Sequence, residues 1–179
     1  MRAVIDIETG GFSITKNGVC EIAAIVIDEN YNEISSFHRY IKPYLRPDSD
    51  ELVSYKDDAM AVNGIKMSDI ENGEEVERVV LDLNNFLIEN KVNTIVGHNS
   101  NLFDIPRILY LFKRFIYVDA VLPVEKYIDT IELAKKKINL KNYNLPFLCE
   151  YFKIDNSNKH TATGDCESTI ELLKKLETK

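Results

Sequence analysis

The chain has 179 residues, of which 45% are hydrophobic and 28% are charged, values that are ordinary for a globular protein of one domain. No apolar stretch approaches the roughly 20 residues of a transmembrane helix, so the composition excludes a bilayer-spanning segment and predicts no membrane contact. Three separated cysteines without a C-x-x-C pair argue against a disulfide framework and a zinc knuckle. Because no signal-peptide pattern is present, we expect a single cytoplasmic domain over residues 1–179.

The net charge is −7, but acidic and basic residues are unevenly distributed along the chain. Residues 1–97 carry 9 Lys and Arg against 18 Asp and Glu, whereas residues 98–160 carry 10 against 7. A polyanion is therefore expected to meet the second of these segments. Part of the acidity elsewhere could belong to metal ligands, whose charge bound cations would offset.

The first 42 residues have the pattern of three consecutive strands. Residues 2–8 are an apolar run that holds two acids, residues 19–27 are almost entirely apolar, and residues 33–42 alternate. A turn-rich segment separates the second run from the third, so the pattern predicts an antiparallel meander. Pro43 and Pro47 then end regular structure.

The rest of the chain is predicted to alternate helices with short strands. After the polar, mixed residues 48–66, helical periodicity covers residues 68–90, with Ser68 and Asp69 as plausible caps. Two further strands are expected at residues 94–97 and 127–129. Four further helices are expected at residues 105–115, at 130–137, from about Pro146 and at 165–177. This succession indicates one α/β domain with a mixed sheet, and the polar, Gly-containing residues 155–164 are expected to form a loop.

Asp6 and Glu8 are two residues apart on the first predicted strand, so their carboxylates project from the same face. The neighbouring residues Val4, Ile5 and Ile7 are apolar, which indicates a partly buried strand. Two like charges side by side repel and lose hydration, and a cation that neutralises them removes this cost. Hard cations such as Mg²⁺ take oxygen ligands, so the pair is a candidate metal site, although a surface acid pair has the same pattern.

Two further acids stand at predicted helix starts. Asp104 follows a buried strand and a polar segment, and ligand sites of α/β sheets cluster at such strand-to-helix turns. Asp165 follows a polar loop that contains His160, a residue type suited to take a proton from water near neutral pH. Taken alone, Asp104 is better explained as the N-cap of its helix, and Asp165 could cap its helix or bind a metal. A lone loop histidine is usually solvated, so neither segment alone decides the function.

The three segments together resemble the motifs of the DEDD superfamily of 3′→5′ exonucleases, the DnaQ-like group. The residues that carry this resemblance are Asp6-Ile7-Glu8 for the D-x-E motif, Asn99 to Asp104 for the second motif, and His160 to Asp165 for the H-x-A-x-x-D motif. The last form is typical of the histidine subgroup, because the tyrosine subgroup has Tyr at the position of Thr161. The similarity extends over nearly the whole chain and implies the α/β ribonuclease-H-like fold, a mixed five-stranded sheet flanked by helices.

Details of the motifs indicate which members of the superfamily the chain resembles more. One more residue separates Asn99 from Asp104 than in the proofreading epsilon subunit of bacterial DNA polymerase III. The spacing is more similar to the N-x-x-x-[FY]-D form of three-prime repair exonucleases and family B polymerases, and Gly164 also resembles the repair enzymes. Asn63-Gly64-Ile65 resembles the H-G-I segment of the family with Asn in place of His, and Asp129-Thr130 resembles its D-T segment.

The resemblance implies a phosphodiester hydrolase that uses two divalent metal ions, Mg²⁺ or Mn²⁺. Asp6, Glu8 and Asp165 would hold one ion, and Asp6 would bridge to a second, with Asp104 assisting directly or through water. The two ions would stabilise the attacking and leaving oxygens of an in-line displacement, and His160 would deprotonate the attacking water. The implied contacts to the terminal nucleotides are Thr9, Ile65, Asn99 and Phe103, and the last could stack on a base or be a core aromatic.

The leading hypothesis is therefore a 3′→5′ exonuclease that releases nucleoside 5′-monophosphates from single-stranded or frayed 3′ ends of DNA, in repair or as the proofreading partner of a DNA polymerase. An exoribonuclease of the same superfamily, for RNA maturation or oligonucleotide turnover, is the alternative, because no residue decides the choice of sugar. A catalytically inactive binding module with the same fold is a third hypothesis. The presence of all four acids and the histidine counts against it.

Overall fold

A computed structural model describes residues 1–158 and 160–178 of the chain. Lys159, which belongs to the expected loop 155–164, and Lys179 lie outside the described residues. The strands of the described part are β1 (Arg2–Thr9), β2 (Val19–Ile27), β3 (Glu33–Tyr40), β4 (Thr94–Gly97) and β5 (Lys126–Asp129). They lie close to the predicted strands and form one five-stranded sheet in the order β3-β2-β1-β4-β5.

The sheet is mixed, as predicted. β1 pairs antiparallel with β2, and β2 pairs antiparallel with β3, which confirms the meander. β4 runs parallel to β1 on its other side, and β5 runs parallel to β4. The pairing of β1 with β4 reaches only as far as Val4, so the second half of β1 has a strand neighbour on one side only.

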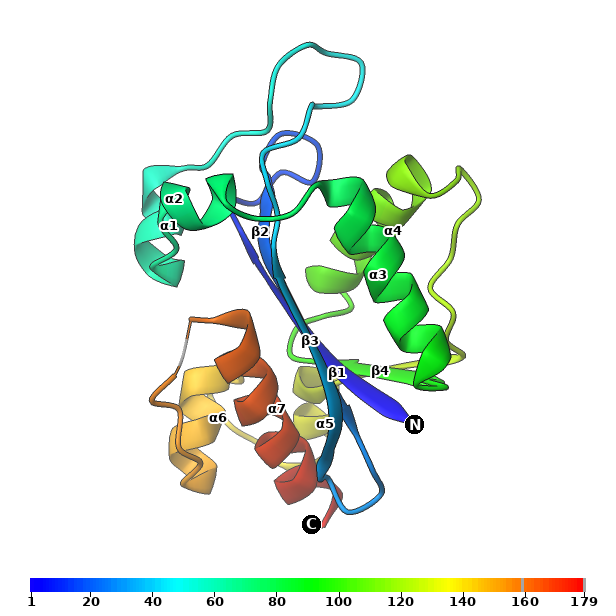
Figure 1. The fold of residues 1–179 in the computed structure, drawn as a ribbon. Coiled ribbons are helices and arrows are strands. Elements are labelled where there is room, and N and C mark those ends of the chain that lie inside the picture. The colour runs from blue at the N-terminus through cyan, green and yellow to red at the C-terminus, as the bar shows by residue number, and fades with distance from the viewer. Residues whose placement is uncertain (159, 179) are drawn as a thin grey trace.

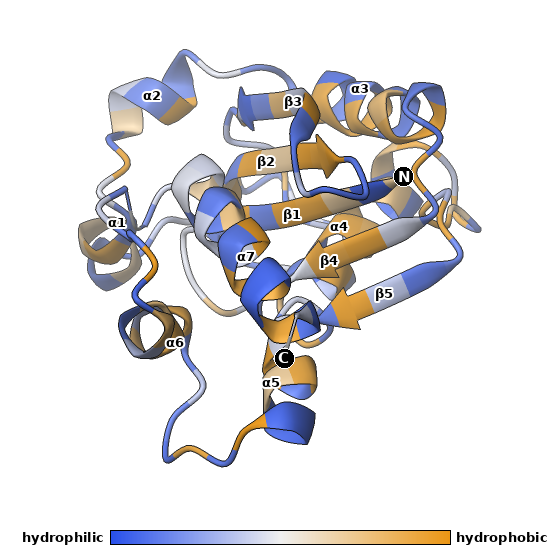
Figure 2. Cartoon of the chain, turned by 90° about the horizontal axis from the view of Figure 1, so that it is seen from below, coloured by the Kyte–Doolittle hydropathy of each residue, from blue (hydrophilic) through white to orange (hydrophobic). Residues whose placement is uncertain are grey.

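Helices cover both faces of the sheet (Figure 1). On one face, α3 (Val76–Glu89) and α4 (Asp104–Phe115) pack through apolar side chains that include Leu83 and Ile108. On the other face, α7 (Ala162–Glu177) packs through Cys166 and Leu173, with α5 (Thr130–Lys137) and α6 (Leu145–Phe152) beside it. Because β2 is covered on both faces it is buried along its whole length, and apolar residues dominate it in Figure 2.

The prediction of a single helix over residues 68–90 is wrong, because the segment forms two helices, α2 (Met67–Glu71) and α3. Between them the chain passes the end of β3, where a Cβ on Gly73 would lie 2.6 Å from the backbone oxygen of Tyr40. The N–H of Glu74 donates to that oxygen at 2.9 Å, so bonds to the sheet replace helical ones. The N-cap positions are Lys66 and Glu75 in place of Ser68 and Asp69, although the Asp69 carboxylate accepts the N–H of Lys66.

Two other helix boundaries differ from the prediction. The polar region 48–66 contains a short helix, α1 (Asp57–Asn63), which lies beside the carboxyl end of β1. The last helix begins at Ala162 instead of Asp165, because the side chain of Thr161 caps it by accepting the N–H of Gly164. Asp165 therefore belongs to the first turn of α7, and the predicted loop is correspondingly shorter.

The three cysteine thiols, at Cys20, Cys149 and Cys166, are buried and free. Within the described ranges, none of the helices combines the length and the apolar character needed to cross a bilayer.

Candidate active site

Three of the four predicted carboxylates meet at the carboxyl end of β1. One oxygen from each of Asp6, Glu8 and Asp165 lies within 4.8 Å of the other two. Asp6 and Glu8 share one face of β1, and Asp165 comes from the first turn of α7, which packs across that face. Three carboxylate oxygens at this spacing form the kind of hard ligand set that divalent cations such as Mg²⁺ and Mn²⁺ take.

Asp104 lies beside this triangle and is held there by the strand itself. It is only 3% exposed, and its Oδ1 accepts the N–H of Ile7, between Asp6 and Glu8, at 3.0 Å. Since β4 no longer pairs with β1 at this point, the carboxylate takes the place of a strand partner. The N-cap position of α4 is Phe103, so Asp104 is not the cap of its helix.

Burial raises the pKa of all four carboxyl groups, and repulsion from neighbouring acids adds to this effect. Burial raises the pKa of Asp6 well above its ordinary value, and repulsion from Asp104, Asp165 and Glu8 adds to this. Burial raises the pKa of Glu8 to about 8 and that of Asp104 to about 7. For Asp104, the hydrogen bond from the backbone N–H of Ile7 acts in the opposite direction and lowers the pKa. Burial also raises the pKa of Asp165. The metal-free site therefore holds protons near neutral pH, which a bound cation would displace.

Metal-free protein is expected to lose stability as the pH rises from about 4 to about 8. A carboxyl group whose pKa is higher in the folded protein favours folding fully below its unfolded pKa, and this contribution disappears as the pH rises through the folded pKa. For Glu8 and Asp104 that interval ends at about 8 and about 7. Urea denaturation in EDTA should show a falling free energy of unfolding, and excess Mg²⁺ at pH 8 should restore it by binding the folded state.

The variant Glu8→Gln serves as the control for this pH dependence, because it removes one of the raised carboxyl groups. Its free energy of unfolding in EDTA should fall less steeply between pH 4 and pH 8 than that of the wild type. Equal slopes for the two proteins would contradict the assignment of the pH dependence to this cluster.

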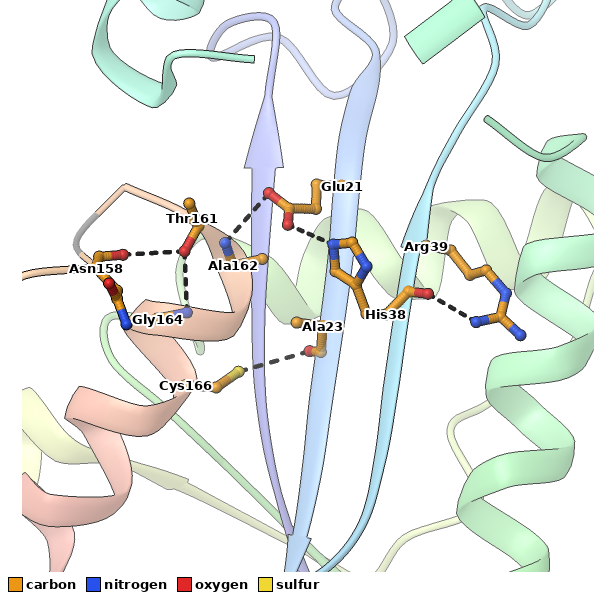
Figure 3. A network of polar contacts seen from close by, with 9 residues as sticks. All are labelled: Glu21, Ala23, His38, Arg39, Asn158, Thr161, Ala162, Gly164 and Cys166. Atoms are coloured by element: carbon orange, nitrogen blue, oxygen red, sulfur yellow. Dashed lines mark hydrogen bonds and ion pairs between the residues drawn. The ribbon is translucent and has the colours of Figure 1, made fainter. Parts of the chain in front are cut away.

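His160 is half-buried and directly precedes the N-cap residue of α7. Its φ of 65° lies in the left-handed region, which is uncommon for a residue with a side chain. The backbone N–H and the charge of His160 both act to lower the pKa of Asp165, so the residue lies beside that carboxylate. Asn158 is held close to the start of α7, because the hydroxyl of Thr161 donates to the backbone oxygen of Asn158 at 2.9 Å (Figure 3).

Two of the four predicted nucleotide contacts border the carboxylates. Thr9, at the end of β1, lines a pocket of about 260 Å³ together with Glu8, Gly11 and Phe12. Phe103 lies half-buried at this end, with Phe12 at 6.4 Å edge-on and the Arg107 guanidinium 3.7 Å from its ring centre. Phe103 is thus a partly exposed aromatic that packs against the border of the core.

The other two predicted contacts lie in different surroundings. Asn99 is exposed, adopts a φ of 60° and lines a second groove on the side of α5 and α6. Ile65 is buried with Cys20 and Ile70 in a small apolar cluster and offers little surface to a nucleotide. Its neighbour Asn63 reaches the site more directly, because the Asn63 amide donates to the backbone oxygen of Thr9 at 3.4 Å.

The sequence did not reveal the roles of three residues at this end of the sheet. Phe12 is 81% exposed beside the pocket, and its backbone oxygen accepts a hydrogen bond from Arg107. Asp129 accepts the backbone N–H groups of Asn99 and Asn101, so it shapes the second motif. Glu21 is a buried acid opposite Glu8, and its only signal was one charge within an otherwise apolar strand.

A family model described as an exonuclease, RNase_T, matches residues 3–173 of the chain. The chain is 31% identical over 175 residues to the PolC-type DNA polymerase III of Caldanaerobacter subterraneus subsp. tengcongensis, and 97% of the chain and 11% of the polymerase are covered. It is 29% identical over 180 residues to the PolC-type enzyme of Thermotoga petrophila, with 97% and 12% covered. The chain therefore spans a small part of the length of these relatives.

Among solved structures, the zinc-bound form of the complex of E. coli ExoI with single-stranded DNA resembles the chain with a TM-score of 0.80. The identity is 23%, and the match covers 99% of this chain and 40% of that chain. A likeness at this identity concerns the fold, and it confirms the predicted exonuclease fold of the DnaQ-like type.

Proposed function

Since the chain belongs to the exonuclease family whose model matches residues 3–173, we propose that these residues form one domain that removes nucleotides from the 3′ ends of DNA. The products would be nucleoside 5′-monophosphates. The observation that carries this proposal is the triangle of Asp6, Glu8 and Asp165, with Asp104 and His160 at its border. The same five residues stand in the order and spacing of the histidine subgroup.

The carboxylates fit divalent metal ions because their charge is in excess. All four have pKa values raised mainly by burial, so divalent cations would favour the ionised carboxylates, which burial alone disfavours. Asp6, Glu8 and Asp165 would hold one Mg²⁺ or Mn²⁺ ion, and Asp6 would share a second that Asp104 assists. Bound ions supply electrostatic stabilisation of the attacking and leaving oxygens.

The side chains of the domain would supply the proton transfer and the grip on the substrate. The imidazole of His160 would accept the proton of the attacking water at a ring nitrogen. The pocket beside Thr9 would hold the terminal nucleotide, and the exposed ring of Phe12 would stack on a base. The pocket and the carboxylates share Glu8, so a nucleotide in the pocket would lie beside the proposed metal ligands.

A basic groove supports the assignment of a nucleic acid as the substrate. The groove of about 480 Å³ that contains Asn99 is also lined by Lys135, Lys141, Asn142 and Tyr143, and none of its lining residues in the described part of the chain is an acid. It lies in the segment 98–160, which carries the excess of basic residues. The phosphates of a single strand could follow this groove from the carboxylates outward.

The relatives favour DNA over RNA and suggest a working context. Two matched relatives are DNA polymerases, and a structural neighbour is a complex with single-stranded DNA. We therefore place the proposed activity beside a DNA polymerase, where frayed 3′ ends of a primer would be its substrate.

Single strands labelled at the 5′ end test the proposed function. With Mg²⁺ or Mn²⁺, the protein should shorten a DNA strand one nucleotide at a time, whereas EDTA or a blocked 3′-hydroxyl should prevent this. Faster digestion of a matched RNA strand would show that RNA, and not DNA, is the preferred substrate. Cleavage of a circular single strand would contradict the exonuclease assignment and leave only a metal-dependent nuclease.

A further inference from the structure

Glu21 is a buried carboxylate that the proposed chemistry does not use. It lies in β2 directly opposite Glu8 and is 2% exposed. Among the described residues, the acids that approach one another closely enough to share an ion are Asp6, Glu8 and Asp165, without Glu21. Its charge nevertheless adds to the repulsion on Asp6 and Glu8. Because Glu21 adds to the repulsion among these carboxylates, a stabilising contact is needed to offset its electrostatic cost.

Both oxygens of Glu21 have directed contacts (Figure 3). Oε1 lies 2.6 Å from Nε2 of His38 in β3, and Oε2 accepts the backbone N–H of Ala162 at 3.2 Å. Ala162 is the first residue of α7, and N–H groups in the first turn of a helix have no partner within the helix. A carboxylate at this end also interacts favourably with the helix dipole. Glu21 therefore joins the start of α7 to the sheet.

Among the described residues, the contact of Glu21 is one of two polar contacts that join the start of α7 to the sheet. The second is made by Cys166, whose thiol approaches the backbone oxygens of Val4 and Ala23 at 3.5 and 3.7 Å. Asp165 stands between these two anchored residues, and His160 stands two residues before Ala162. The hydrogen bond from the N–H of Gly164 to the side chain of Thr161 joins two residues at the start of α7 and makes no contact with the sheet.

We propose that Glu21 is a positioning residue, whose carboxylate holds the start of α7 where Asp165 and His160 meet the acids of β1. The inference rests on the proposed function, because the two residues that it positions are the proposed metal ligand and the proposed base. A displacement of about 1 Å in such a group costs roughly 10²-fold in rate. The effect belongs to kcat more than to KM, because Glu21 lines neither the pocket nor the groove described above.

The pair Glu21→Ala and Glu21→Gln tests the inference. The alanine variant removes the bridge, and its kcat should fall roughly 10- to 100-fold with a higher Mg²⁺ midpoint and a KM for the oligonucleotide within about 3-fold of wild type. The glutamine variant keeps an oxygen for Ala162 and an amide for His38, so it should retain most of the activity. Leu173→Ala, in the core contact of α7, is the control for lost stability, and it should keep the wild-type kcat below its melting temperature.

Hydrogen exchange separates this inference from the proposed function, because it needs no activity. In Glu21→Ala, backbone exchange should speed up at least about 10-fold at residues 162–165 and stay unchanged in the middle of α7. Uniformly faster exchange, or a wild-type kcat in Glu21→Ala, would overturn the positioning role. A glutamine variant as inactive as the alanine variant would also overturn it, because the charge itself would then be required. An inactive wild type with the local exchange effect would contradict the proposed function alone.

Discussion

The variant Asp6→Asn is expected to release nucleotides at least about 10³-fold more slowly than the wild type, and to be more stable without metal. Asp6 belongs to the carboxylate triangle and is repelled by Asp104, Asp165 and Glu8. An amide binds Mg²⁺ poorly and no longer offsets its charge, so the reaction should lose its electrostatic support. The same amide removes repulsion from the empty cluster, and the melting temperature in EDTA should rise by about 2–4 °C per kcal/mol relieved.

Single-turnover cleavage and thermal melting in EDTA measure the two effects of Asp6→Asn. Glu89→Gln is the matched control, because Glu89 is an exposed acid on α3, and it should change neither quantity. Cleavage by Asp6→Asn at the wild-type rate would contradict the proposed metal site. A melting temperature in EDTA below that of the wild type would contradict the repulsion within the cluster.

The second large effect is expected for His160, whose loss should reduce kcat by roughly 10²–10⁴-fold, the usual contribution of a positioned general base. Two variants are needed because the backbone of His160 adopts a φ of 65°. Asparagine tolerates this conformation better than alanine does, so His160→Asn removes the imidazole with less strain than His160→Ala. Both variants should bind Mg²⁺ with the wild-type midpoint, since the four carboxylates remain.

The pH–rate profile of the His160 variants gives the more specific readout. The profile should be measured at saturating Mg²⁺, because Glu8 and Asp104, with pKa values of about 8 and about 7, must also lose protons before a metal binds. Under that condition the wild-type rate should fall on acidification as the base is protonated, and His160→Asn should lack this limb. Ser157→Ala, in the same loop, should keep it. An unchanged kcat and acid limb in both His160 variants would show that the residue is not the base.

The parts of the fold that were predicted correctly depend on local signals. An apolar run, a turn-rich separator and an alternating segment place β2 and β3 to within about two residues, because side-chain patterns and turn chemistry act over short distances. The family was predicted from three short motifs, and the family match over residues 3–173 confirms it.

The errors arise where distant segments decide local structure. The helix predicted over residues 68–90 is interrupted at Gly73 because the end of β3 binds the chain there, and no local pattern reports that contact. The first turn of α7 contains Thr and Gly, which are weak helix formers, yet Thr161 and Glu21 supply partners for its N–H groups. The partner of Ala162 is 141 residues away in the sequence, so this support could not be read from the motif.

The sequence predicted which residues lie at the candidate site better than it predicted how their side chains are placed there. Ile65 was expected to contact a nucleotide on the strength of the H-G-I resemblance, but it packs inside a small apolar cluster. Phe12 offers its exposed ring beside the pocket, and neither its exposure nor its link to Arg107 follows from the sequence. The face that a side chain occupies depends on packing between elements, which a strand or helix pattern does not contain.

The most direct test of the metal-dependent account is the anomalous scattering of Mn²⁺ in crystals of the protein grown with a nucleoside 5′-monophosphate. One manganese peak is expected among the oxygens of Asp6, Glu8 and Asp165. A second is expected at about 3.5–4 Å from the first, shared by Asp6 on the side of Asp104. Crystals of protein that is active with Mn²⁺, but without manganese at these carboxylates, would contradict the account.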